Sequence, residues 1–197
     1  MCACNESSKI AYRQAYEELR LTRSLLLESG AGGGQLHGGV LQNLHRYRSV
    51  THWEELLCIA VNTRLDCLMA VVSIRQPDGY SSIVSDGGSK EFIRFFIDWG
   101  DGESYQPVGL HSFEVCDPIH VDEPGRLPYH QLITTTFDAE RYWDSVLDGI
   151  QPKVCGVLSW NQAPPEESTF QPIFGNRVES RIRADSIKDV LALYHHI

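Results

Sequence analysis

The stretch FIRFFIDWGDGESYQPVGLHSFEV, residues Phe92–Val115, decides the fold. Its first half alternates, and every second side chain is large and apolar: Ile93, Phe95, Ile97 and Trp99. Such alternation is typical of a strand with one buried face. The sequence Trp-Gly-Asp-Gly follows, and Asp-Gly favours tight hairpin turns. We therefore expect two antiparallel strands joined by a turn that Trp99 anchors in the core.

Short runs of β-branched or aromatic residues, separated by turn residues, continue over residues 51–185. We expect strands in seven segments: Glu55–Asn62, Leu65–Arg75, Lys90–Trp99, Pro107–Cys116, Tyr129–Asp138, Lys153–Asn161 and Arg177–Ala184. The segment AERYWDSVLDGI is more typical of a short helix. Seven short strands predict a mainly β domain, an immunoglobulin-like antiparallel β-sandwich. Alternation predicts these core residues: Leu57, Ile59, Val61, Leu68, Ala70, Val72, Ile74, Phe95, Ile97, Trp99, Val154, Leu158, Trp160, Val178 and Ile182.

Two amphipathic helices are expected outside the sandwich. The first, Ser8–Glu28, belongs to an N-terminal region, residues 1–40, that ends in a glycine-rich stretch. We interpret that stretch as a flexible joint on which the helix pivots. The second is a short helical tail over residues 186–197. The sandwich is assigned to residues 51–185.

Composition restricts the classes of function. There are 17 Lys and Arg residues against 26 Asp and Glu residues, and the formal net charge is −9. Phosphate binding needs a concentrated positive surface, so nucleic acid is not an expected partner. No apolar run reaches the roughly 18 residues of a membrane-spanning helix, and the N-terminus lacks the apolar core of a signal peptide. A cytoplasmic protein with cysteines buried in strands is expected.

Two sets of residues are candidate metal sites, and each also has a purely structural explanation. Asp98, Asp101 and Glu103 offer hard oxygen ligands in a glycine-containing turn, which suits calcium, although a hairpin turn explains the same residues. His120, Asp122 and His130 have the donor types of a transition-metal or zinc site. No catalytic motif has both the spacing and the context that its chemistry requires. The sequence therefore predicts no catalytic residue and no cofactor.

Several short motifs carry a resemblance to known proteins. They are Gly79-Tyr80-Ser81, Gly88-Ser89-Lys90-Glu91, Leu158-Ser159-Trp160, Pro164-Pro165 and Gly175-Asn176-Arg177. With them, residues 54–184 resemble a group of uncharacterised bacterial β-sandwich proteins. The resemblance implies a bacterial origin and no particular activity. The segment DWGDG is also similar to the PKD-type immunoglobulin-like repeat, which implies a sandwich.

These observations favour a non-catalytic protein-interaction module, a subunit or adaptor of a bacterial cytoplasmic assembly. An apolar helix on a flexible joint suits docking in a groove of a partner protein or of a second copy. The expected partner-binding residues are Ile10, Tyr12, Tyr16, Leu19 and Leu26. One alternative is a sandwich that binds calcium or a glycan at its loops. A second is a metal-dependent hydrolase built on His120, Asp122 and His130.

Overall fold

The computed structural model describes residues 17–18, 20–23, 49–63, 65–80, 88–102, 104–116, 128–147 and 149–181. After the helical residues 17–18 and 20–23, seven strands and one further helix follow in order along the described part of the chain. They are β1 Glu54–Asn62, β2 Cys67–Ile74, β3 Ser89–Asp98, β4 Gln106–Val115, β5 Tyr129–Thr136, α3 Ala139–Leu147, β6 Lys153–Trp160 and β7 Arg177–Arg181. All seven predicted strands and the predicted short helix are confirmed.

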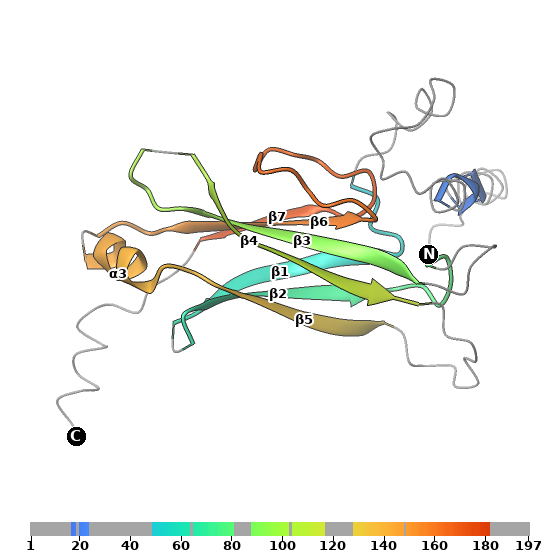
Figure 1. Cartoon of the computed structure of the whole chain (residues 1–197), viewed down its shortest axis with the longest axis horizontal. Helices are drawn as coiled ribbons and strands as arrows, with labels where there is room; N and C mark the ends of the chain where they lie inside the picture. The colour runs from blue at the N-terminus through green and yellow to red at the C-terminus, as the bar shows by residue number, and fades with distance from the viewer. Residues whose placement is uncertain are drawn as a thin grey trace, which may run out of the picture.

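The strands form two antiparallel sheets that pack face to face (Figure 1). The smaller sheet has the order β1-β2-β5 and the larger has the order β4-β3-β6-β7. The opening hairpin supplies β3 and β4, which pair in register from Ser89 opposite Val115. Because β3 lies between β4 and β6, it is the strand around which the larger sheet is built. The two-sheet, mainly β prediction is therefore confirmed.

Most of the predicted core residues lie between the two sheets, but Leu57 does not. Leu57 is 46% exposed, whereas Leu56 and Ile59 are buried. A β-bulge between Leu56 and Cys58 interrupts the alternation of β1, so the inward face changes parity at that point. Val61 and Val178 are only partly buried and pack at the margin of the core.

Both lateral edges of the sandwich are closed by contacts between the sheets. At one edge β4 meets β5, and a Cβ atom added to Gly109 would lie 2.2 Å from Thr135 Oγ1, so only glycine allows this approach. At the other edge, Asn176 Oδ1 accepts a hydrogen bond from the Leu56 amide at 2.7 Å, and its Nδ2 donates to the Leu56 carbonyl at 2.9 Å. This amide thus joins the start of β7 to β1.

The outer face of the larger sheet carries a second, smaller apolar cluster. Phe96, Cys155 and Val157 are fully buried there, covered by Tyr105 and Phe170. Burial raises the pKa of the Cys155 thiol to about 11 and the pKa of Tyr105 to about 12. Cys67 and Cys155 are buried as expected, whereas Cys58 and Cys116 are exposed, contrary to the expectation for strand cysteines.

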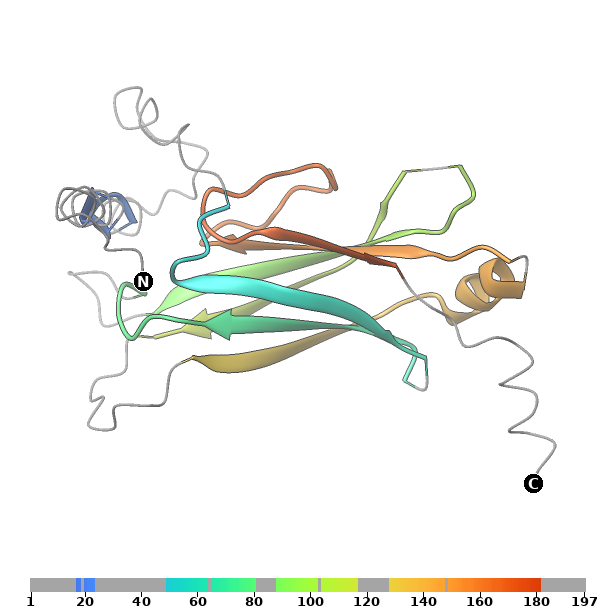
Figure 2. The same cartoon turned by 180° about the vertical axis from the view of Figure 1, so that it is seen from behind.

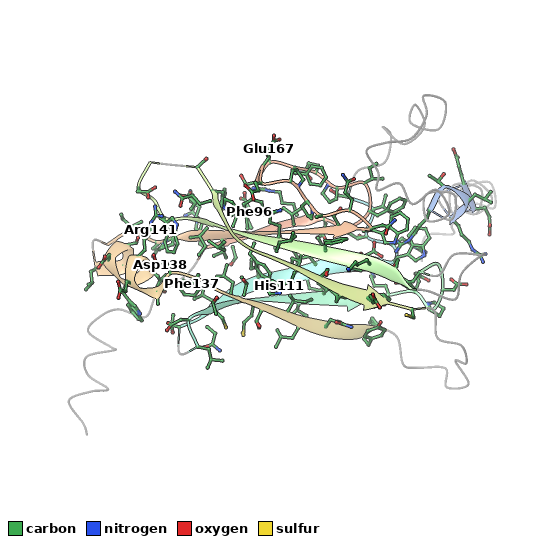
Figure 3. The ribbon with its side chains drawn as sticks, viewed as in Figure 1. Phe96, His111, Phe137, Asp138, Arg141 and Glu167 are labelled. Carbon is green, nitrogen blue, oxygen red and sulfur yellow. The ribbon has the colours of Figure 1, made fainter. Side chains whose placement is uncertain are left out.

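The turn after β3 and the helix α3 meet at one end of the sandwich. Figure 3 labels Asp138 and Arg141 at the start of α3, where Asp138 Oδ1 accepts a hydrogen bond from the Arg141 amide at 3.1 Å and caps the helix. The Arg141 guanidinium lies 4.9 Å from the centroid of Trp99, which is 3% exposed. The predicted role of Trp99 as the buried anchor of the turn is confirmed.

The other end of the sandwich receives the N-terminal helix, of which residues 17–18 and 20–23 are described. Figures 1 and 2 show this helix and α3 at opposite ends of the molecule. The predicted tail, residues 186–197, and the predicted core residue Ile182 lie outside the described residues. Among the helices in the described part of the chain, none has the length and apolarity needed to cross a membrane.

Candidate functional site

The most unusual feature of the structure is a buried arginine at the end of the sandwich that meets the N-terminal helix. Arg23 extends from that helix and is 1% exposed, although it is charged. Its guanidinium occupies what we call the Arg23 pocket, formed by Trp53, Glu54, Tyr80, Glu91, Trp160 and Phe174. A buried charge needs charged or strongly hydrogen-bonded partners, and the pocket supplies two carboxylates.

The strand pairing explains why these residues meet. Glu54 begins β1 and faces the last residue of β2, while Glu91 lies near the start of β3 opposite Trp160 at the end of β6. Tyr80 follows β2, and Phe174 lies in the loop before β7, where it bridges to Val50. Antiparallel pairing therefore brings strand ends and loops from both sheets to the same end of the sandwich.

Two carboxylates face the guanidinium, at different distances. Arg23 Nη1 donates to both oxygens of Glu54, at 3.2 Å and 3.0 Å. Arg23 Nη2 lies 3.6 Å from Glu91 Oε1, which is within ion-pair range but longer than a hydrogen bond. Both glutamates are fully buried. Glu54 is thus the direct partner of Arg23, and Glu91 is the second, looser one.

Four aromatic rings surround the same guanidinium. The Arg23 Cζ atom lies 4.5 Å from the ring centroid of Trp160, 4.7 Å from Trp53, 5.1 Å from Tyr80 and 5.5 Å from Phe174. Each distance is within the range of a cation–π interaction. A planar guanidinium stacks on such rings better than an ammonium group does. The pocket is therefore matched to arginine in shape as well as in charge.

The walls of the pocket are held by contacts in which Arg23 takes no part. The Tyr80 hydroxyl donates to the Trp53 carbonyl at 2.6 Å, and Ser89 Oγ lies 3.1 Å from Glu91 Oε1. Phe174 packs edge-to-face on both indoles, with centroids 5.9 Å from Trp53 and 5.3 Å from Trp160. Gly79 (φ +97°) passes so close to Trp53 that an added Cβ would lie 2.3 Å from Nε1.

The single positive charge of Arg23 faces two buried carboxyl groups, so it can neutralise only one of them if both are ionised. Burial raises the pKa of Glu54, although the charge and hydrogen bonds of Arg23 oppose this. Burial raises the pKa of Glu91 well above its usual range, and the charge of Glu54 raises it further. Because Arg23 is closer to Glu54, Glu91 is the carboxyl that retains its proton more readily.

The acidic turn that suggested calcium has basic partners in the structure. Asp98 Oδ2 lies 3.0 Å from Lys153 Nζ, and Asp98 Oδ1 accepts from the Gly100 amide at 2.9 Å. Asp101 Oδ2 lies 2.5 Å from Arg141 Nη2. Glu103 lies outside the described residues. The two aspartates therefore face Lys153 and Arg141, and within the described segments no three His, Cys, Asp or Glu side chains form a metal-binding group.

The other predicted site residues lie mostly in segments that are not described. These residues are Ile10, Tyr12, Tyr16, Leu19 and Leu26 of the helix and His120 and Asp122 of the loop. His130, the remaining member of the histidine site, is exposed on β5. The structure therefore tests neither of these two sets.

Sequence reasoning missed the Arg23 pocket, although two signals were available. Glu91 has the same parity along its strand as Ile93, Phe95 and Ile97, so the alternation itself places a carboxylate on the core face. Residues from four of the motifs that carried the resemblance also meet here: Tyr80, Glu91, Trp160 and, next to Phe174, Gly175. In the sequence, Arg23 stands near the C-terminal end of the expected helix Ser8–Glu28, where a basic side chain is explained by the helix dipole alone.

Comparisons with known proteins add no functional assignment. No family model and no curated protein sequence matches this chain. Two solved structures of a β-glucosidase from Kluyveromyces marxianus, one in complex with glucose and one labelled with selenomethionine, match at TM-scores of 0.28 and 0.29 with 11% and 8% identity. Each alignment covers 66% of this chain and 14% of the enzyme. This chain thus corresponds to a small part of that enzyme's length.

Proposed function

We propose that this chain is a non-catalytic protein-interaction module, a subunit or adaptor of a bacterial cytoplasmic assembly, and that it presents its N-terminal helix to a partner protein. One observation supports this function above others. The side chain of Arg23 anchors the helix in the sandwich, whereas Leu21, on the same helix, is 61% exposed.

The two residues separate the helix into an anchoring side and a free side. Positions two apart on a helix point in widely different directions, so Leu21 and Arg23 belong to different faces. Glu17, Glu18 and Arg20 are exposed as well. An exposed leucine with surrounding charges is the composition of a helix that docks in an apolar groove. Of the predicted partner-binding residues Ile10, Tyr12, Tyr16, Leu19 and Leu26, helical spacing in the sequence places Ile10 on the side of Leu21 and the other four on the side of Arg23, so in this proposal only Ile10 extends the docking surface.

The anchoring of Arg23 changes how the helix must be tested. The glycine-rich joint suggested that residues 1–40 can be removed without harm to the sandwich. Removing Arg23, however, would leave Glu54 and Glu91 buried without their cation. A deletion would therefore confuse loss of binding with loss of stability, and point substitutions on the exposed side of the helix are preferable.

The sandwich itself is proposed to be immunoglobulin-like. Its strand orders, β1-β2-β5 and β4-β3-β6-β7, support this assignment. They correspond to immunoglobulin strands A-B-E in one sheet and C′-C-F-G in the other, with no strand D. Such domains commonly act through loops and added segments at the ends of the sandwich, which is where the N-terminal helix lies.

The test is co-purification of the tagged full-length chain from cells of its source organism, with the eluted proteins quantified by mass spectrometry. Leu21→Asp is the informative variant, since Leu21 is 61% exposed on the helix. Leu132→Asp is the matched control, because Leu132 is 63% exposed but lies on β5. Both substitutions are expected to leave the melting temperature nearly unchanged.

We expect a stoichiometric protein, or a second copy of this chain, to accompany the wild type and Leu132→Asp but not Leu21→Asp. Size-exclusion chromatography with light scattering separates the homo-oligomer from the heteromeric complex. If the wild type elutes as a lone monomer, or if Leu21→Asp retains the whole complex, the proposed function is wrong.

A further inference from the structure

We propose that the Arg23 pocket is a guanidinium-recognition site in its own right, with Arg23 as its resident ligand, and that it binds a monoalkylguanidinium from outside the chain when Arg23 is withdrawn. The ligand class is the side-chain group of arginine. This inference does not rest on the proposed function, because it concerns the walls of the pocket and not the exposed face of the helix.

The charge of the pocket requires a cation. Glu54 and Glu91 are both fully buried, and both lie within 3.6 Å of the Arg23 guanidinium. Without a cation, the two carboxylates are buried together in an apolar surround, which is strongly unfavourable unless they take up protons or water. An empty pocket is therefore expected to attract a small cation.

The shape of the pocket selects a guanidinium among cations. The four ring centroids lie between 4.5 Å and 5.5 Å from the central carbon of the bound group. A flat, weakly hydrated guanidinium can stack on several rings while its edge donates to carboxylates, whereas an ammonium is compact and strongly hydrated. We therefore expect alkylguanidinium to bind better than alkylammonium of equal length.

Arg23 does not use all of the hydrogen-bonding capacity of the pocket. Within the described residues, Glu91 Oε2 and Trp160 Nε1 are buried without a hydrogen-bond partner, and so are Arg23 Nε and Nη2. The helix holds the guanidinium 3.6 Å from Glu91, too far for a hydrogen bond. A ligand that is not fixed to the helix is free to move closer to Glu91, so Arg23 is a replaceable occupant.

The pocket is also preformed. Its six residues come from β1, β3, β6 and adjoining loops of the sandwich, and the Tyr80–Trp53 and Ser89–Glu91 contacts do not involve the helix. Preorganised walls reduce the free energy lost when a ligand binds. Withdrawal of Arg23 is therefore expected to leave a cavity with its acidic and aromatic groups in place.

The test uses the full-length Arg23→Ala variant and small probes at pH 7. Ethylguanidinium is the ligand mimic, ethylammonium tests the shape requirement, and the neutral ethylurea tests the charge requirement. Thermal unfolding and titration calorimetry are the readouts. Free arginine and N-acetylarginine methylamide then distinguish a metabolite from an arginine within a polypeptide, since only the former carries a free ammonium and carboxylate.

We expect ethylguanidinium to raise the melting temperature of Arg23→Ala saturably, because a ligand at tenfold its Kd increases the folding constant about 11-fold. Ethylurea and ethylammonium should give little or no rise. The matched control is Arg23→Ala/Glu54→Gln, which lacks the main carboxylate and should lose the effect. If the blocked arginine binds and free arginine does not, the natural ligand is a polypeptide arginine.

Absence of a saturable rise, or an equal rise with ethylurea, overturns the proposal. If Arg23→Ala does not fold, Arg23→Lys serves instead, because lysine keeps a positive charge near both glutamates. Ethylguanidinium should then displace the lysine and stabilise the variant, and failure to do so counts equally against the proposal. Wild-type chain, in which Arg23 is tethered, should show a much weaker response at the same concentrations.

Discussion

Glu54 and Glu91 carry the same side chain and are equally buried, yet replacing each by glutamine should have very unequal effects on stability. Glu54→Gln removes the carboxylate whose two oxygens accept hydrogen bonds from Arg23 at 3.0 Å and 3.2 Å. Glu91→Gln removes a carboxylate that lies 3.6 Å from the same guanidinium. Glutamine has nearly the shape of glutamate, so the comparison isolates charge.

The size of the difference follows from which ion is left without a partner. Breaking a buried pair by removing one partner costs about 3–5 kcal/mol, because the remaining charge stays buried. We expect Glu54→Gln to reduce the free energy of unfolding by about 3 kcal/mol, the low end of this range, because Glu91 remains near Arg23. We expect Glu91→Gln to change it by less than about 1 kcal/mol at pH 7, because Glu54 still neutralises Arg23.

The pH dependence gives an independent check. Because the pKa of Glu91 is raised in the folded protein above its ordinary value of 4.5, the folded state holds a proton that the unfolded state releases. The resulting stabilisation is complete below about pH 4.5 and is lost as pH rises through the folded pKa. Relative to Glu91→Gln, the wild type should therefore lose stability with rising pH, by at most about 1.4 kcal/mol per pH unit.

Urea unfolding of the wild type, Glu54→Gln and Glu91→Gln is followed by tryptophan fluorescence between pH 4 and pH 9. These curves give the free energy of unfolding of each protein and its dependence on pH. Relative to wild type, Glu91→Gln should gain stability steadily as pH rises, while Glu54→Gln should remain the least stable near neutral pH. Equal losses for the two variants, or a Glu91→Gln difference that does not change with pH, would refute the assignment of Glu54 as direct partner and Glu91 as proton holder.

Substitutions at four further positions test the fold by thermal and urea unfolding. Gly79→Ala should cost about 1–2 kcal/mol, because φ is +97° there and the new Cβ would meet Trp53. Asn176→Ala should cost about 2 kcal/mol through two lost hydrogen bonds to β1, and Asn176→Asp should cost at least as much, because it retains the acceptor but sets a second carboxylate oxygen against the Leu56 carbonyl oxygen. Leu57→Ser should change the free energy of unfolding by less than about 0.5 kcal/mol, because Leu57 is exposed. Leu56→Ser should reduce it by more than about 2 kcal/mol, because Leu56 is buried. Similar losses for the two variants would contradict the bulge in β1.

Local pattern was enough to predict the strands, because alternation and turn chemistry act between near neighbours in the chain. The hairpin of β3 and β4 is the clearest case, since Trp99 is buried as its alternation with Ile97 predicts. The same rule failed at Leu57, where a bulge adds a residue that no alternation rule anticipates. A bulge is decided by pairing with the neighbouring strand, which a single segment does not contain.

The Arg23 pocket was beyond prediction for a related reason. Its members are spread along the chain from Arg23 to Phe174, and they meet only because antiparallel pairing brings strand ends together. Glu91 was visible as a carboxylate on a core face, but the sequence gives no sign of which cation neutralises it. An amphipathic pattern also predicts the buried side of a helix from its apolar residues. In this helix the described residue that is buried against the sandwich is the charged Arg23.

An ionic anchor makes physical sense for a helix that must sit in one place. Apolar side chains of similar volume often replace a buried ion pair at no loss of stability, so stability alone does not explain Arg23, Glu54 and Glu91. Apolar contact, however, tolerates sliding and rotation, whereas a guanidinium that pairs with Glu54 and is enclosed by four rings has little freedom to move along or around the helix axis. A single well-matched arginine is thus able to hold the helix in register, and the same selectivity is what makes the pocket a receptor for another guanidinium.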